Sequence, residues 1–249
     1  MKIIAIATAK GGTGKTTTCV NLAYALSVKG KKILLIDTDK QGNLANYFNL
    51  TTEKTLASFM RNTENGVDII AVRKNIDLIN SGKEELAKTE KILTGERSPV
   101  KVMAKSFSSL NGYDFVFLDL GPSLSLINEN ALFFCDEILI PVSIGFFDMT
   151  GIDQVLRIAE EISKEDRLTK PIKINGIFLN MFDKRTKIAE QIEKTLRQRF
   201  KSKVFETKVR KNVAVAEAPA FHKSIQEYEP NSYGSQDFNN LAMEFLDRG

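Results

Sequence analysis

The chain has 249 residues, 43% of them hydrophobic and 27% charged, which is the composition of an ordinary globular protein. No window approaches the roughly 18 to 20 uncharged apolar residues of a membrane span, and glycines end the N-terminal apolar run too early for a signal peptide. The two cysteines, Cys19 and Cys135, lack metal-ligand spacing and indicate a reducing, cytoplasmic setting. A net charge of +4 does not by itself indicate a nucleic-acid partner.

Short β-branched runs alternate with amphipathic stretches along the chain, which is the pattern of βαβ units and a mainly parallel sheet. Several runs are apolar without alternation, so helices should cover both faces of the sheet. The chain therefore predicts a doubly wound α/β fold, with residues 1–249 forming a single domain. The predicted strands are Ile3–Ala7, Lys32–Asp37, Asp68–Val72, Ile76–Ile79, Phe115–Asp119, Ile138–Val142 and Ile172–Leu179.

Between the strands, apolar residues recur at helical spacing. The segment 83–112 has the least regular pattern, and we expect a peripheral insertion there. The predicted helices bury three stripes, formed by Ile152, Val155, Leu156, Ala159 and Ile162, by Ile188, Ile192, Leu196 and Phe200, and by Phe238, Leu241, Ala242, Phe245 and Leu246.

The stretch "ATAKGGTGKTTT" at residues 7–18 follows the first strand and opens a helix. Backbone N–H groups and a helix N-terminus would surround one point there, which makes an anion site. Lys15 can reach the β- and γ-phosphates of a nucleotide, Thr16 can ligate a bridging Mg²⁺, and Thr17 can bond the α-phosphate. A glycine-rich turn without a ligand is the alternative, but the strand–loop–helix context favours a nucleotide. The strict pattern is altered, because Ala9 replaces its first glycine and Lys10 follows.

Two predicted strands end in an aspartate, Asp37 and Asp119. Ligands of open α/β sheets lie beyond the carboxyl ends of the strands, so both carboxylates should face the glycine-rich loop. One could hold Mg²⁺ through water and the other could orient an attacking water. The alternative is that such an aspartate caps a helix or lies in a solvated turn.

Four ordered segments, "KGGTGKTTTCVNLAYAL", "LLIDTDKQGN", "FLDLGPSLS" and "NVAVAEAPAFHKSI", resemble the ParA/Soj partition ATPases. This family belongs to the deviant-Walker class that also contains MinD. The resemblance covers nearly the whole chain. It implies a P-loop ATPase that uses ATP and Mg²⁺ and forms an ATP-dependent homodimer.

The resemblance also implies roles for individual residues. Lys10 matches the signature lysine that reaches the partner's phosphates across the dimer, and Asp39 matches the switch I aspartate that positions the hydrolytic water. Asp119 matches the acidic residue held near Mg²⁺ by water. The implied catalytic residues are Lys10, Lys15 and Asp39; the metal residues are Thr16, Asp39 and Asp119; the nucleotide-binding residues are Lys10, Gly11, Gly12, Thr13, Gly14, Lys15, Thr16 and Thr17, with Asn212 and, as a second candidate, Asn180 on the base side.

The chain departs from the family pattern at four positions. The family usually has proline at the positions of Lys40, Gly121 and Arg210, and many relatives carry an arginine used for DNA at the position of Ala214. Gly121 either loosens the loop after Asp119 or offers its N–H to the γ-phosphate.

Positive charge is concentrated between Lys184 and Lys211, where eleven Lys/Arg and three Asp/Glu give a surplus of +8 and leave the rest of the chain at −4. A solvated surface helix is one explanation. The resemblance favours another, in which these side chains contact DNA phosphates without reading sequence, in a nucleoid-associated protein whose ATPase a ParB-like partner stimulates. The candidate DNA contacts are Lys187, Lys194, Arg197, Arg199, Arg210 and Lys211.

Other ATP-dependent functions make different predictions. A MinD-like protein would bind membrane through a basic C-terminal helix, whereas "NNLAMEFLDRG" carries Glu244 and Asp247, so we expect a core helix and no membrane partner. A nitrogenase-type reductase would need cysteines for an iron–sulfur cluster, but we expect Cys19 and Cys135 to be buried core thiols. A small-molecule kinase would need an acceptor substrate and could dispense with Lys10. A MinD-like or other ATPase that positions cargo stays open as the alternative, as does the identity of the cargo.

Overall fold

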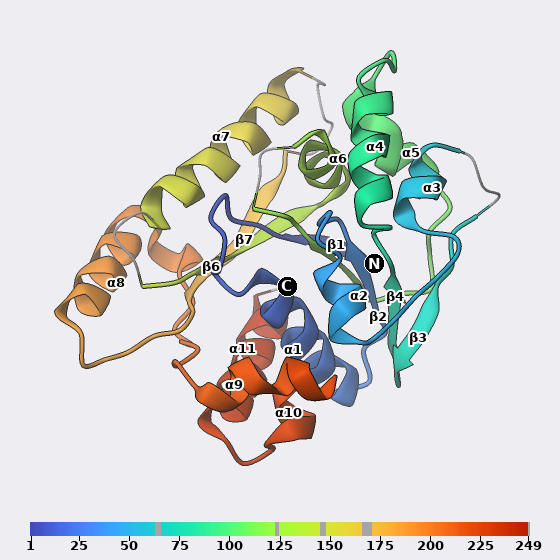
Figure 1. Ribbon diagram of the computed structural model, residues 1–249. Helices are drawn as coiled ribbons and strands as arrows, with labels where there is room; N and C mark the ends of the chain where they lie inside the picture. Colours follow the sequence, from blue (N-terminus) through green and yellow to red (C-terminus); the bar gives the residue numbers. More distant parts are fainter. Residues whose placement is uncertain (63–65, 123–124, 145–147, 166–170, 249) are drawn as a thin grey trace.

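A computed structural model describes residues 1–62, 66–122, 125–144, 148–165 and 171–248 of the chain (Figure 1). The described residues form a seven-stranded sheet in the order β3-β4-β2-β5-β1-β6-β7, parallel throughout except where β3 runs antiparallel to β4. All seven predicted strands are confirmed, with bounds that differ by at most two residues. They are β1 (Lys2–Ile6), β2 (Ile33–Asp37), β3 (Ile70–Arg73), β4 (Ile76–Ile79), β5 (Phe115–Asp119), β6 (Glu137–Val142) and β7 (Lys173–Leu179).

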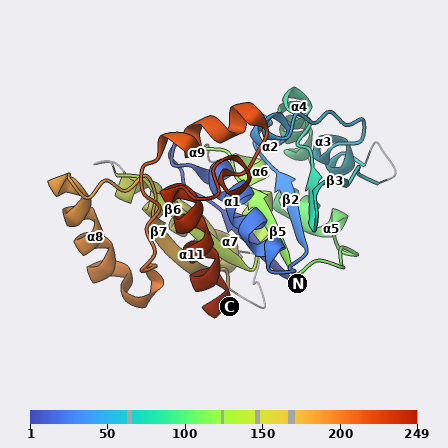
Figure 2. The same cartoon turned by 90° about the horizontal axis from the view of Figure 1, so that it is seen from below.

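Helices cover both faces of this sheet, as Figures 1 and 2 show. In Figure 1, α4 to α7 lie above the sheet and α1, α9, α10 and α11 lie below it. The helices of the described chain are α1 (Lys15–Val28), α2 (Asn43–Tyr47), α3 (Leu56–Met60), α4 (Glu84–Leu93), α5 (Val102–Ser106), α6 (Leu126–Phe134), α7 (Asp148–Glu165), α8 (Lys187–Phe200), α9 (Val213–Glu217), α10 (Ile225–Tyr228) and α11 (Tyr233–Asp247).

The hydrophobic core is divided by the sheet into two layers. Along β1, Ile3 and Ala5 face one layer, while Ile4 and Ile6 face the other. This alternation follows from the two-residue period of a strand, and it requires apolar residues at every position of a central strand. The doubly wound α/β fold predicted from the sequence is confirmed.

The segment 83–112 is part of the core, so the expected peripheral insertion is wrong. Leu86 and Leu93 of α4 and Met103 of α5 are buried in the layer that α6 and α7 also cover. Short helices with few apolar residues hide this role in the sequence, because each contributes only one or two side chains to the core.

The predicted apolar stripe of α8 is only partly buried. Leu196 and Ala189 are fully buried, and Ile192 and Phe200 are partly buried against the core, but Ile188 is 40% exposed. The helix lies at the periphery of the molecule (Figure 1), so the sheet cannot cover its first turn completely.

The C-terminal helix packs against the core, as predicted. Phe245 of α11 is buried, and its ring lies 5.3 Å from the ring of Phe115 and 5.9 Å from that of Phe117 in β5. Phe238, Leu241 and Ala242 are also buried. Across the described residues, the search for helices long and apolar enough to cross a bilayer finds none.

Candidate active site

The carboxyl ends of β1, β2 and β5 meet at one edge of the sheet. The parallel register places Asp119 beside Ile6 on one side and beside Asp37 on the other. The loops that follow these strands therefore converge on a single region.

The loop between β1 and α1 depends on its glycines for two separate reasons. Gly12 and Gly14 have φ angles of +74° and +83°, in the left-handed region that other residues rarely adopt. In addition, a Cβ on Gly14 would lie 2.4 Å from Nδ2 of Asn180. The chain then enters α1 at Lys15, so the loop presents a helix N-terminus to the region where the strands end.

Lys15 points into this loop. Its side chain is buried, with the residue only 7% exposed, and Nζ donates to the backbone carbonyl of Lys10 over 3.0 Å. Burial lowers the pKa of Lys15, and the negative charges of Asp119 and Asp39 partly offset that effect. The loop thus holds a desolvated ammonium close to the residue predicted to act across a dimer.

Thr16 and Asp119 form the pair expected of a magnesium site. The Thr16 hydroxyl donates to Asp119 Oδ2 over 2.6 Å, while Asp119 Oδ1 is buried and has no partner among the described residues. Burial raises the pKa of Asp119 to about 7. An orphaned carboxylate oxygen beside a threonine hydroxyl suits Mg²⁺ held by the hydroxyl and by water.

The metal's remaining ligands would have to come from the nucleotide and solvent. The described residues contain no cluster of three or more His, Cys, Asp or Glu side chains that could hold a metal alone. When bound, Mg²⁺ would neutralise phosphate charge at this site.

Asp37 does not face the loop, so that part of the sequence prediction is wrong. Its carboxylate accepts hydrogen bonds from the N–H groups of Asp39 and Leu44, both at 3.0 Å, and of Ala45 at 3.4 Å. Burial raises the pKa of Asp37 well above its usual range, and these N–H groups oppose the shift. Asp37 therefore caps the start of α2, which was the alternative reading of a strand-terminal aspartate.

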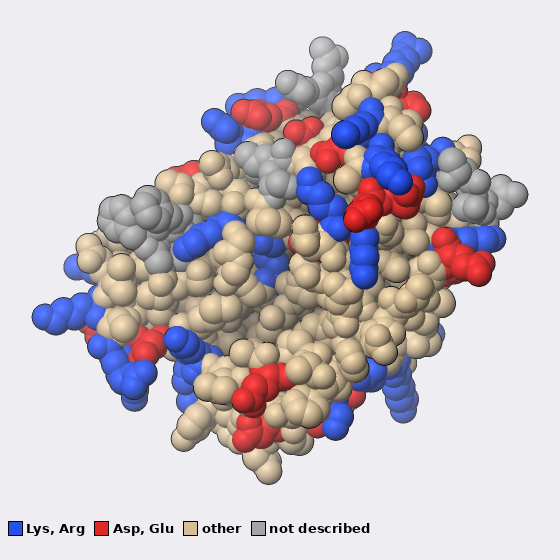
Figure 3. Space-filling model, in the orientation of Figure 1, with Lys and Arg blue, Asp and Glu red and all other residues tan. Residues whose placement is uncertain are grey.

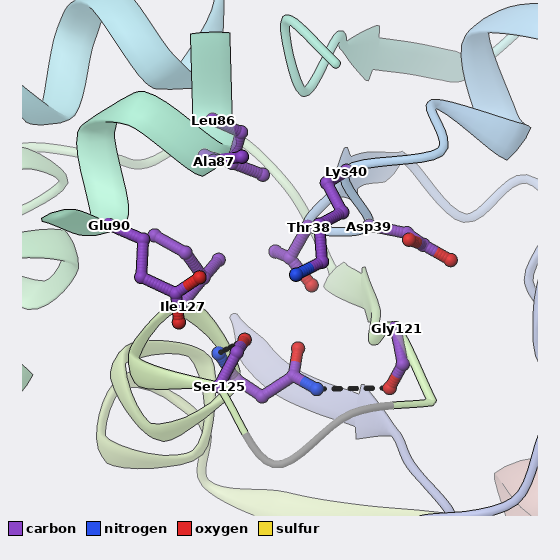
Figure 4. A pocket seen from close by; sticks show the side chains of 10 residues that line it. Thr38, Asp39, Lys40, Leu86, Ala87, Glu90, Gly121, Ser125 and Ile127 are labelled. Carbon is purple, nitrogen blue, oxygen red and sulfur yellow. Dashed lines mark hydrogen bonds between the residues drawn. The ribbon is translucent and has the colours of Figure 1, made fainter. Parts of the chain in front are cut away.

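Asp39 lies in the loop that follows β2, close to Gly121, and is 6% exposed. It accepts hydrogen bonds from the Gln41 N–H over 3.0 Å and from Nδ2 of Asn43 over 3.2 Å. It also lines a pocket with about 250 Å³ of empty space, part of it open to solvent. Figure 4 shows Lys40 and Glu90 entering this pocket from different walls, the loop after β2 and helix α4.

The two asparagines predicted on the base side have structural partners. Asn180 is 3% exposed and donates through Nδ2 to the carbonyl of Thr13 over 2.8 Å. This hydrogen bond joins the end of β7 to the phosphate loop. Asn212 accepts from the Ala214 N–H over 2.8 Å and caps α9. Contacts from either residue to a nucleotide base stay predictions.

The predicted DNA contacts fall into two groups. Arg197 pairs with Glu206 and Glu193, Arg199 with Asp153, and Arg210 with Asp237. Acidic side chains accordingly lie among the basic ones in the area of α8 at the left of Figure 3. Within the described chain no ion pair involves the other three candidates, Lys187, Lys194 and Lys211, all of them exposed.

Three residues that the sequence did not single out shape the site. The Thr38 hydroxyl donates to the Asp119 carbonyl over 2.7 Å, and Asn128 Nδ2 donates to the Gly121 carbonyl over 2.9 Å. Glu90 accepts from the N–H of Leu126 at the start of α6 over 2.7 Å. Asn128 offered one signal, because it is a polar residue next to the apolar Ile127 in the helix "LINENALFF".

Comparisons with known structures agree with this architecture. Apo McdA from Cyanothece superposes with a TM-score of 0.87 at 21% identity, covering 99% of both chains. Cobyrinic acid a,c-diamide synthase from Mycobacterium smegmatis, solved with an ATP analogue and magnesium, gives a TM-score of 0.80 at 22% identity and covers 99% of this chain and 94% of that one. At these identities the likeness concerns the fold.

Comparisons of the sequence also identify the family. A family model described as an AAA domain matches residues 1–174. The sporulation initiation inhibitor protein Soj of Bacillus subtilis is 32% identical, covering 100% of this chain and 99% of that protein. The chromosome-partitioning ATPase Soj of Thermus thermophilus is 34% identical, with coverage of 98% and 95%. The phosphate loop suits ATP and the Thr16–Asp119 pair suits Mg²⁺, and the chain belongs to the ParA/Soj family of ATPases.

Proposed function

We propose that this protein is a DNA-partition ATPase that works as a switch. Two copies associate face to face when ATP and Mg²⁺ are bound, with Lys10 of each copy reaching the other's phosphates. The dimer binds DNA without sequence preference and is nucleoid-associated. Hydrolysis, stimulated by a ParB-like DNA-binding partner, separates the copies and releases DNA. The observation that carries this proposal is a complete phosphate loop with Lys10 inside it, in a chain related over its full length to chromosome-partitioning proteins.

The residues of the site divide the work of hydrolysis. Phosphoryl transfer requires mainly positioning and charge neutralisation. Lys15 places a positive charge inside the loop, Asp39 orients the attacking water, and Lys10 adds charge from the partner copy. Because one lysine comes from the second copy, turnover depends on dimer formation.

The lysines, and not the arginines, are the proposed DNA contacts. These lysines are Lys187, Lys194 and Lys211, all of them exposed. An ammonium group that makes no ion pair can neutralise a DNA phosphate at little cost, whereas Arg197, Arg199 and Arg210 would first have to leave their carboxylate partners.

A mobility-shift titration on random DNA tests the proposal. We expect binding with ATP and Mg²⁺, and much weaker binding with ADP. The triple variant Lys187→Gln/Lys194→Gln/Lys211→Gln should weaken it by about 10-fold or more and flatten its salt dependence. The matched control is Arg197→Gln/Arg199→Gln, which should bind nearly as well as the wild type.

The same purified protein also tests the competing MinD-like function. The DNA proposal is wrong if the wild type binds no DNA with ATP under low salt. ATP-dependent sedimentation with anionic vesicles, in the absence of any DNA binding, would instead support a MinD-like function.

A further inference from the structure

Gly121 lies where the phosphate loop and the Asp39 loop approach each other. It is buried two residues after Asp119, and a Cβ added to it would lie 3.3 Å from both Cγ and Oδ1 of Asp39. The next residue, Pro122, approaches the phosphate loop, with its Cβ 3.9 Å from the position of a Cβ on Gly11. The backbone at Gly121 is therefore close to both sides of the nucleotide site.

This position carries a donor that proline would lack. No residue in the described ranges accepts a hydrogen bond from the Gly121 N–H. Buried backbone N–H groups nearly always have a partner, so an unpaired one at a ligand site needs an explanation. A proline at this position would have no N–H at all.

Hydrogen bonds on both sides hold the Gly121 backbone in place. Its carbonyl accepts from Nδ2 of Asn128, which is 6% exposed on α6. The preceding N–H, that of Leu120, donates to the carbonyl of Ile6 in β1 over 3.4 Å. The start of α6 is itself tied to α4, because Glu90 accepts from the N–H of Leu126. A donor held this way needs little reorganisation when charge arrives.

We propose that the Gly121 N–H hydrogen-bonds the terminal phosphate of bound ATP and that Asn128 is the positioning residue for this donor. The inference deepens the ATPase part of the proposed function and does not depend on DNA. It assigns Gly121 a role in distinguishing ATP from ADP, since only ATP carries the phosphate that this donor would contact.

The test compares affinities for a non-hydrolysable ATP analogue and for ADP, both with Mg²⁺. Gly121→Pro removes the donor and should weaken analogue binding by about 10-fold or more, while ADP binding changes by less than about 2-fold. Gly121→Ala keeps the N–H and should keep the preference for the analogue. Its turnover should nevertheless fall, because the added methyl group crowds the Asp39 carboxylate.

Asn128→Ala provides a second route that leaves residue 121 unchanged. It should lower analogue affinity and leave ADP affinity nearly constant. The matched control is Asn130→Ala, since Asn130 is also buried on α6 but bonds Pro99, Leu126 and Met103. That control should lose thermal stability without changing the ratio of the two affinities.

Two results would overturn the inference. One is a Gly121→Pro protein that folds and keeps the wild-type analogue-to-ADP ratio. The other is an Asn128→Ala protein that loses affinity for both nucleotides equally. A wild type that shows the expected ratio but never binds DNA would refute the partition proposal and leave this inference intact.

Discussion

Ionisable side chains are buried together at the carboxyl edge of the sheet. Lys15, Asp37, Asp39 and Asp119 are each less than 10% exposed. Asp37 satisfies its carboxylate with three backbone N–H groups, whereas Asp119 leaves one oxygen without a partner in the described chain. Asp37 therefore orders the backbone at the start of α2, whereas Asp119 has an oxygen that could bond a ligand.

The Asp119 carboxyl should make the nucleotide-free protein less stable as pH rises. Its pKa is about 7 in the folded protein against 3.8 as the reference, so between these values the folded state binds the extra proton and stability falls with increasing pH. Relative to Asp119→Asn, the free energy of unfolding should drop by about 3 kcal/mol from pH 5 to pH 8. Urea unfolding in EDTA measures this, and parallel pH profiles would contradict it.

Lys10 should be needed for dimerisation and not for nucleotide binding. Lys15, which lies inside the loop of its own copy, serves as the comparison. We expect Lys10→Ala to bind ATP, remain monomeric in light scattering and lose most ATPase activity, whereas Lys15→Ala should lose ATP binding itself. Normal turnover by the Lys10→Ala protein would exclude a role across the dimer.

At the level of elements, charge in the sequence and charge on the surface differ. The segment from Lys184 to Lys211 has a surplus of +8, yet several of its arginines are paired. Arg197 pairs with Glu206 between α8 and α9, Arg199 with Asp153 on α7, and Arg210 with Asp237 on α11. Arg210 joins the strand-like segment before α9 to α11, where its guanidinium also stacks on Tyr233 at 4.3 Å.

Removing the carboxylate that holds Arg210 should destabilise the protein. Asp237 is 4% exposed and accepts hydrogen bonds from the Arg210 backbone N–H and from its guanidinium. Asp237→Ala should cost about 2 to 3 kcal/mol, because it leaves donors without acceptors. The control Asp153→Ala breaks an exposed pair with Arg199 and should cost less than about 1 kcal/mol. Equal losses in chemical unfolding would contradict this ranking.

At the scale of the whole molecule, the chain's last helix helps to close the core over α1 and β5. The aromatic contacts of Phe245 with Phe115 and Phe117 join residues more than a hundred positions apart. A helix used in this way cannot leave the body of the protein without exposing a large apolar area.

Shortening the Phe245 side chain should therefore lower the stability of the entire fold. Phe245→Ala should lower the free energy of unfolding by about 3 to 5 kcal/mol in a single cooperative transition. Met243→Ala, on the same helix but 47% exposed, should change it by less than about 0.5 kcal/mol. If both variants unfold like the wild type, α11 is not a core element.

Much of this architecture depends on local patterns, and the sequence alone predicted it. Apolar runs indicated all seven strands because a central strand must be apolar on both faces. The glycines and Gly14-Lys15-Thr16 indicated the phosphate loop because the left-handed backbone and the helix start are local properties. The family resemblance is confirmed by the full-length relatives, and the roles that it implies for Lys10 and Asp39 stay predictions.

Which polar groups meet was decided only by the tertiary structure. Asp37 was assigned to the loop although it caps α2, Arg197 and Arg199 proved to be paired, and segment 83–112 belongs to the core. Partners such as Arg199 and Asp153 are 46 positions apart, and no local pattern specifies such a pair. The sequence by itself determined the fold and the kind of ligand, because both follow from backbone conformation and apolar periodicity. The tertiary structure decided which charges stay available, because a charge is neutralised only by a neighbour that folding brings to it.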